Sequence, residues 1–178
     1  MIFISGVHGV GKSYFCNKMK NQLGIETFSA SKLISERKHT NFQTNKLIPD
    51  IDENQQYLLI AVQELNSINR NYLLDGHMCL LNERCEITRI PEDTFIALQP
   101  QAIILLIDEP EIIAERRKSR DGVDHNINQI KEFQNEEIVY AKETSSKLGI
   151  PLKISEGTND KSLRDFLLLH WEGFKSGR

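Results

Sequence analysis

One segment near the amino end carries residues that suit phosphate chemistry: Gly6-Val7-His8-Gly9-Val10-Gly11-Lys12-Ser13, which has the spacing G-x-x-x-x-G-K-S of a phosphate-binding loop (P-loop). Glycines allow the backbone angles that wrap such a loop around a phosphate with its N–H groups directed inward. The lysine suits the β- and γ-phosphates, and the hydroxyl that follows suits Mg²⁺. The segment therefore predicts a site for ATP and Mg²⁺ built from all eight residues, with His8 facing a phosphate, the second substrate or solvent.

Two carboxylates could complete this site, because each follows an apolar run that is expected to form a strand. They are Asp75 and Asp108. Open parallel sheets bind ligands beyond the carboxyl ends of their strands. Asp75 is the preferred partner of Mg²⁺, directly or through its waters, because Gly76 lets the backbone approach a ligand closely. The alternative role of Asp108 is to cap a helix that starts near Pro110.

Short apolar runs alternate with segments of helical periodicity, which is typical of a parallel sheet covered by helices. The run Ala102–Ile107 is apolar without a break, as a central strand buried on both faces requires. Asp52 is expected to cap a helix over Tyr57–Leu65 with Gln55 in the capping-box position, and a last helix is expected over residues 159–174. The expected strands are Ile2–Ser5, Ile25–Phe28, Tyr72–Asp75, Ala102–Ile107 and Leu152–Ile154.

Length, composition and charge bound the organisation and the partners of the chain. A chain of 178 residues fits one domain, 1–178, and 39% apolar with 26% charged residues is a globular balance. A net charge of −3 offers no overall attraction to nucleic acid or to an anionic membrane, so neither is expected as a partner. Three cysteines without disulfide-type spacing, and no apolar run of membrane length, predict a cytoplasmic protein. The oligomeric state stays open.

Taken in their order, four segments resemble the nucleoside monophosphate kinases, and among these archaeal-type adenylate kinase most closely. The resemblance runs from Met1 to about Ser155, and the P-loop is its one highly specific part. The segments are Gly6–Ser13, Leu73-Leu74-Asp75-Gly76-His77, Leu98-Gln99-Pro100 and Asp108-Glu109-Pro110-Glu111-Ile112-Ile113-Ala114-Glu115-Arg116-Arg117.

On the donor side, the resemblance implies a helix that leads from the fourth strand into a short lid, at about 116–128, whose arginines clamp the transferring phosphate. Arg116 and Arg120 stand at the matching positions, four residues apart and so on one helical face. Planar guanidinium groups suit phosphate oxygens, and phosphoryl transfer depends on positioning and charge neutralisation. The alternative is a solvated basic helix end that pairs with Glu111 or Glu115.

On the acceptor side, the resemblance implies that the turn Asp75-Gly76-His77 meets the acceptor nucleotide, with His77 and Gln55 in its site. The family holds the monophosphate with an arginine that is absent here, where Leu33-Ile34-Ser35 occupies the segment. The nearby cations that could replace it are Lys32, Arg37, Lys38 and Lys46.

These observations predict a three-layer α/β P-loop fold with five parallel strands in the order 2-3-1-4-5, flanked by helices. The expected activity is phosphoryl transfer from ATP to a small acceptor, first AMP or another nucleoside monophosphate, with Lys12, Asp75, Arg116 and Arg120 as catalytic residues. Two alternatives stay open. One is a kinase for a hydroxyl-bearing small molecule or nucleic-acid end, which would need Asp75 as a base; the other is a regulatory nucleotide-binding NTPase.

Overall fold

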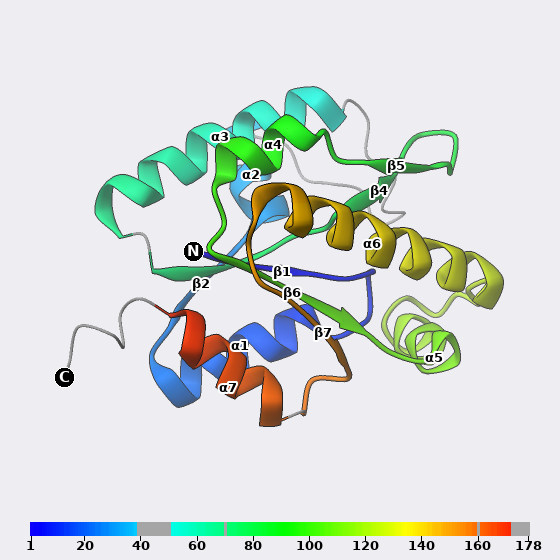
Figure 1. Ribbon diagram of the computed structural model, residues 1–178. Helices are drawn as coiled ribbons and strands as arrows, with labels where there is room; N and C mark the ends of the chain where they lie inside the picture. Colours follow the sequence, from blue (N-terminus) through cyan, green and yellow to red (C-terminus); the bar gives the residue numbers. More distant parts are fainter. Residues whose placement is uncertain (39–50, 70, 160, 172–178) are drawn as a thin grey trace.

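Five parallel strands form the central sheet of the computed structural model, in the order β2-β3-β1-β6-β7 (Figure 1). Numbered among themselves along the chain, these strands follow the order 2-3-1-4-5, so the predicted fold class is confirmed. The structure describes residues 1–38, 51–69, 71–159 and 161–171. The strands of the sheet are β1 (Ile2–Ser5), β2 (Glu26–Ser29), β3 (Tyr72–Asp75), β6 (Ala102–Ile107) and β7 (Leu152–Glu156).

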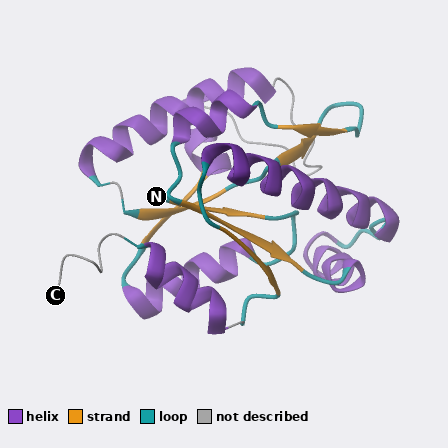
Figure 2. Cartoon of the chain, viewed as in Figure 1, coloured by secondary structure: helices purple, strands orange, loops and turns teal. Residues whose placement is uncertain are grey.

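Helices cover both faces of the sheet, which is why its central strands are apolar. Figure 1 shows α3, α4 and α6 on one side of the sheet and α1 and α7 on the other, and Figure 2 shows the same three layers. Residues 102–106 of β6 are completely buried between these layers. The helices are α1 (Lys12–Leu23), α2 (Ala30–Lys38), α3 (Ile51–Ile68), α4 (Glu92–Leu98), α5 (Pro110–Asp121), α6 (Ile127–Leu148) and α7 (Lys161–His170).

The first helix is bounded by glycines that fix where its charged end lies. Gly11 precedes α1 with φ 109°, and Gly24 ends it with φ 67° while its N–H donates to the Lys20 carbonyl at 2.9 Å. Both are left-handed conformations that glycine adopts without a steric cost. Because α1 begins directly at the P-loop, its N-terminal N–H groups and positive dipole end face the place where a phosphate would lie.

Some predicted boundaries are wrong, and their corrections have simple causes. Asp52 does not cap a helix, because α3 already begins at Ile51; Asp52 lies inside its first turn, where a negative charge still complements the helix dipole. The second strand begins at Glu26 rather than Ile25. The last helix spans Lys161–His170, and residues 172–174 of the predicted range lie outside the described residues.

A two-stranded antiparallel hairpin follows β3 along the chain, and the sequence analysis does not predict it. Its strands β4 (Cys79–Leu81) and β5 (Ile87–Arg89) have three residues each. The hairpin packs on α6, where Arg89 binds Glu136 and Glu143 at 2.6 Å each. This packing places the hairpin beside the carboxyl end of β3, where it closes one side of the pocket described below.

Among the residues that the structure describes, no helix combines the length and the apolar character needed to span a membrane.

Candidate nucleotide-binding site

The P-loop lies directly on the carboxyl end of β6, and its glycines are needed for this approach. A Cβ at Gly6, where φ is 139°, would lie 2.4 Å from the Leu106 carbonyl oxygen. A Cβ at Gly9 would lie 2.9 Å from Cγ of Arg117, on α5. The loop is therefore enclosed between β6 and α5, and a larger residue at either glycine would displace it.

Lys12 lies across this loop and is almost fully buried, at 7% exposure. Its Nζ donates to the Gly6 carbonyl at 2.7 Å and to the Val7 carbonyl at 3.3 Å, and it lies 4.0 Å from Oδ1 of Asp75. Burial lowers the pKa of Lys12, while the charges of Asp75 and Glu137 act in the opposite direction. The cation is thus held within the loop that would receive the phosphates.

The side chains of Ser13 and Asp75 lie within hydrogen-bonding distance of each other. Strand β3 pairs with β1 so that Asp75 lies opposite Ile4, just before the P-loop, and Oγ of Ser13 donates to Oδ2 of Asp75 at 3.0 Å. Burial raises the pKa of Asp75, against the opposing effects of Lys12 and of the Ser13 hydrogen bond. A hydroxyl and a carboxylate are the oxygen ligands that Mg²⁺ takes from proteins, so this pair fits the predicted metal site.

Asp108, the other candidate carboxylate, faces α5 instead. Its Oδ2 accepts from Arg116 at 2.8 Å, and Arg116 also donates to the Val10 carbonyl at 3.3 Å. The side chain of Gln134 binds both backbone groups of Asp108, at 3.1 and 2.9 Å. Asp108 does not cap α5, whose N-cap is Glu109 with Pro110 as the first helical residue. Asp108 therefore anchors Arg116 beside the P-loop rather than completing the metal site.

Arg117, which the sequence analysis does not single out, lies over the P-loop. Its Nε donates to the His8 carbonyl at 2.8 Å, and its Nη2 is buried without a hydrogen-bond partner among the described residues. Burial, with a smaller effect of Arg120, lowers the pKa of Arg117 to about 10. Arg120, in contrast, is 53% exposed and lies 3.8 Å from Asp121. Arg117 thus contacts the loop and keeps one buried donor without a partner among the described residues.

Glu137, on α6, is a second residue that the sequence analysis missed. It is fully buried: Oε2 accepts from Ser5 Oγ at 2.7 Å, and Oε1 accepts from the N–H groups of Met78 and Cys79 at 3.0 Å each. Burial raises its pKa, against these hydrogen bonds and the charge of Lys12. The carboxylate joins the end of β1, which leads into the P-loop, to the turn after β3. A signal existed in the sequence: Ile130, Phe133, Glu137 and Tyr140 share one stripe of the helix.

A pocket lies beside the turn after β3, between α2, α3, α4 and the hairpin. It has an empty volume of about 520 Å³, its open mouth included, and most of its walls are apolar. Five separate stretches of the chain contribute, which explains why no short motif could reveal it. Its lining residues are Phe3, Ala30, Ser31, Ile34, Asn54, Gln55, Leu58, Gly76, His77, Leu80, Ile90, Thr94, Phe95 and Leu98.

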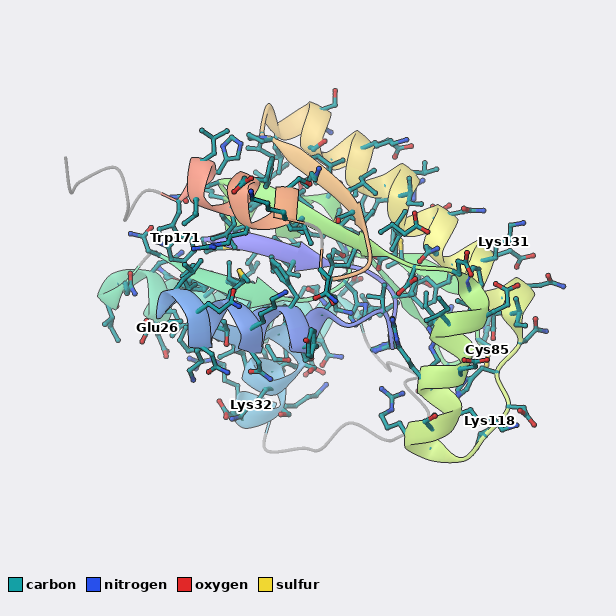
Figure 3. All side chains as sticks on the ribbon, turned by 90° about the horizontal axis from the view of Figure 1, so that it is seen from below. Glu26, Lys32, Cys85, Lys118, Lys131 and Trp171 are labelled. Atoms are coloured by element: carbon teal, nitrogen blue, oxygen red, sulfur yellow. The ribbon has the colours of Figure 1, made fainter. Side chains whose placement is uncertain are left out.

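Two of the predicted acceptor residues, His77 and Gln55, line this pocket. The ring of His77 also lies 4.1 Å from the ring of His8, so the turn after β3 contacts the P-loop. Lys32 does not line the pocket: it is 75% exposed on the outer side of α2 and lies 3.8 Å from Glu36 (Figure 3). Arg37 binds Glu64. Lys46 lies outside the described residues.

Three features define a P-loop nucleotide-binding fold. They are a P-loop at the start of α1, a strand-end carboxylate bound to the serine of that loop, and a sheet of order 2-3-1-4-5. The family described as an AAA domain matches residues 5–133. Since this match covers more than half of the chain, the protein belongs to that family of AAA domains. A search of curated proteins by sequence found no match.

Solved structures with the same fold include two kinases. A gluconokinase from Sinorhizobium meliloti has a TM-score of 0.53 at 13% identity, covering 98% of this chain and 90% of its own. A shikimate kinase from Acinetobacter baumannii, solved with shikimate, has a TM-score of 0.58 at 16% identity, with 94% and 90% covered. At these identities the likeness shows a P-loop kinase-like fold, and it does not favour adenylate kinase over other kinases.

Proposed function

We propose that this protein is an ATP-dependent phosphotransferase whose small acceptor presents a hydroxyl group rather than a phosphate. The observation that carries the proposal is the composition of the pocket beside Asp75. Among the described residues that line it there is neither lysine nor arginine. A phosphate dianion buried there would lack the cationic donors that such a group needs.

The nearest cations of α2 are matched by carboxylates outside the pocket lining. Arg37 binds Glu64, and Nζ of Lys38 lies 2.6 Å from Glu53. To gain a cation from the described residues of α2 that form these pairs, a nucleoside monophosphate acceptor, which the resemblance to adenylate kinase implies, would have to separate one of them. A hydroxyl acceptor needs no such change, and this difference favours it.

The comparisons support the same class of acceptor without fixing its identity. Gluconate and shikimate, after which the two kinase neighbours are named, carry hydroxyl groups. At identities of 13% and 16%, these proteins support only the fold and the general chemistry of the proposal.

For the donor, we propose that the P-loop N–H groups and Lys12 bind the phosphates of ATP, with Ser13 and Asp75 holding Mg²⁺. The metal would neutralise charge on the transferring group. Arg117 donates from Nε to the P-loop, and its Nη2 is buried without a hydrogen-bond partner among the described residues. This Nη2 would contact a phosphate oxygen. The lid roles of Arg116 and Arg120 stay a prediction; Arg116 would first have to leave Asp108.

For the transfer itself, Asp75 is placed between the P-loop and the pocket, because Gly76 and His77 line the pocket directly after it. We propose that the acceptor hydroxyl oxygen bonds to the γ-phosphorus while the bond from that phosphorus to the β,γ-bridging oxygen breaks and ADP leaves. The hydroxyl proton passes to the Asp75 carboxylate.

The test is ADP release measured with and without acceptors. Neutral hydroxyl compounds, gluconate, shikimate and AMP are each incubated with MgATP, with Lys12→Ala as the control for contaminating kinases. Phosphorylation of a hydroxyl group supports the proposal. Conversion of AMP alone to ADP would favour the monophosphate kinase, and equal ADP release without any acceptor would favour the regulatory NTPase.

A further inference from the structure

Gln55 contributes to the pocket wall a buried side-chain oxygen that has no hydrogen-bond partner among the described residues. Gln55, in the first two turns of α3, is 5% exposed and lines the pocket. Its side-chain oxygen Oε1 is sheltered from water and accepts no hydrogen bond among the described residues. A buried amide oxygen without a donor is destabilising, so such an atom in a cavity wall indicates that a ligand supplies the donor.

The role that the sequence suggested for Gln55, closing a capping box, does not account for this position. A capping side chain bonds to the backbone at the start of its helix, whereas Oε1 of Gln55 bonds to nothing there. Its neighbour Asn54, also in the pocket wall, accepts from Lys38 at 3.2 Å. The amide oxygen of Gln55 thus stays without a hydrogen-bond donor among the described residues, whereas that of Asn54 has one.

The rest of the cavity selects for an apolar ring. Phe3 and Phe95 contact each other edge to face, at 5.5 Å between ring centroids, and Leu58 and Leu98 stand beside them in the lining. No lysine, arginine or carboxylate lines the cavity within the described part of the chain. A polyol would lose more hydration there than the few polar side chains of the lining could replace, whereas an uncharged ring would be favoured by burial.

From these observations we infer that the acceptor is an uncharged ring compound with an N–H donor on its ring edge, which Gln55 Oε1 accepts, and a hydroxyl outside the ring that reaches Asp75. A nucleoside with an imide or amide N–H has this chemistry, and a sugar acid or a polyol does not. This inference rests on the proposed kinase function and names the substrate class of its acceptor site.

The first arm of the experiment needs no turnover. Gln55→Leu removes the unsatisfied oxygen and fills nearly the same space, so the Tm of the ligand-free protein should rise, by roughly 2–6 °C. Gln55→Met, of similar length, serves if the leucine variant does not fold. The matched control is Gln56→Leu, the next residue on α3, which is exposed and should leave Tm nearly unchanged.

The second arm measures binding by calorimetry with uridine and with 3-methyluridine, which lacks the ring N–H. We expect uridine to bind the wild type and the Gln56→Leu variant about 10- to 100-fold more tightly than 3-methyluridine. In Gln55→Leu the two compounds should bind equally, because the group that distinguishes them is gone. Shikimate and myo-inositol should bind none of the variants measurably.

Each outcome decides something. Equal binding of the two uridines by the wild type, no binding of either, or a lower Tm in both Gln55 variants would overturn the inference. Tight binding of shikimate or myo-inositol would also overturn it and leave a hydroxyl kinase of another specificity. If uridine binds through Gln55 but is never phosphorylated with MgATP, the proposed kinase function fails while the ring-binding site stands.

Discussion

The donor half and the acceptor half of the site differ in how their polar groups are satisfied. In the donor half, Lys12 bonds to carbonyls of its own loop, and Ser13 bonds to Asp75. In the acceptor half, most of the walls are apolar and the oxygen of Gln55 has no hydrogen-bond partner among the described residues. The charged groups of the donor half bond to one another, so a short motif can specify them. The acceptor pocket instead keeps a polar group for a bond to the ligand, and no short motif defines such a pocket. The following predictions test this contrast, from the largest expected effect to the smallest.

Lys12→Ala should lower kcat by at least about 10²- to 10³-fold, because it removes the buried cation that faces the phosphates. Some loss of Tm is expected as well, because Lys12 is buried beside the carboxylates of Asp75 and Glu137. Turnover and thermal melting measured together check this, with Lys20→Ala, at an exposed position of α1, as the matched control. Near-normal turnover in a folded Lys12→Ala variant would contradict the donor assignment.

Asp75→Asn should lower kcat by about 10²- to 10⁴-fold with a hydroxyl acceptor, because the amide cannot take the proton. Asp108→Asn provides the comparison: its carboxylate faces Arg116, and a much smaller loss is expected. The measurement is kcat for both variants with the best acceptor. A loss of less than about tenfold in Asp75→Asn would remove the base from the mechanism and would instead suit an acceptor that is already anionic.

Arg117→Ala should raise KM for ATP and lower kcat/KM by about 10- to 100-fold, because it removes a buried guanidinium from the P-loop. Arg120→Ala should have little effect on either constant, since that side chain is 53% exposed. Steady-state kinetics of the two variants and of Arg116→Ala check the order. If Arg120→Ala lowers kcat/KM more than Arg117→Ala does, the lid predicted from the sequence closes over the phosphates in a conformation that differs from this structure.

Glu137→Gln should change how stability depends on pH. Burial raises the pKa of Glu137 in the folded protein above its ordinary value of 4.5, so the folded state holds this proton more tightly than the unfolded state. Its contribution to the free energy of unfolding is thus fully present below pH 4.5 and is lost as pH rises through the raised pKa. Burial also raises the pKa of Asp75, in the wild type and in the Glu137→Gln variant alike, so the comparison of the two isolates Glu137.

Urea unfolding of the wild type and of Glu137→Gln between pH 4 and pH 8 gives the measurement. The stability of the wild type relative to the glutamine variant should fall as pH rises. A relative stability that rises with pH, or that stays constant, would show that the ionised carboxylate costs nothing at this position.

Much of the fold could be predicted from the sequence because its signals are local. A continuous apolar run such as Ala102–Ile107 can only be a strand covered on both faces, and the P-loop fixes the strand and helix around it. The hairpin of β4 and β5 was missed because each strand has three residues, too few to show a period.

The site was predicted in proportion to how local its parts are. The P-loop serine and Asp75 lie within hydrogen-bonding distance, whereas Arg117 was missed because the four-residue spacing of Arg116 and Arg120 indicates another helical face. Glu137 was missed because a glutamate that follows another glutamate in a polar helix is usually solvated. Its burial depends on Ser5 and on the turn after β3, which are distant in the sequence.

The central claim, a charged donor half facing an uncharged acceptor half, is tested most directly by one matched pair of acceptors. Uridine and UMP differ only in the phosphate, and each is incubated with MgATP and the wild-type protein while the nucleotide products are separated by chromatography. The account predicts that UMP forms from uridine, and that UDP does not form from UMP at a comparable rate. Rapid formation of UDP from UMP, with uridine left unchanged, would contradict it.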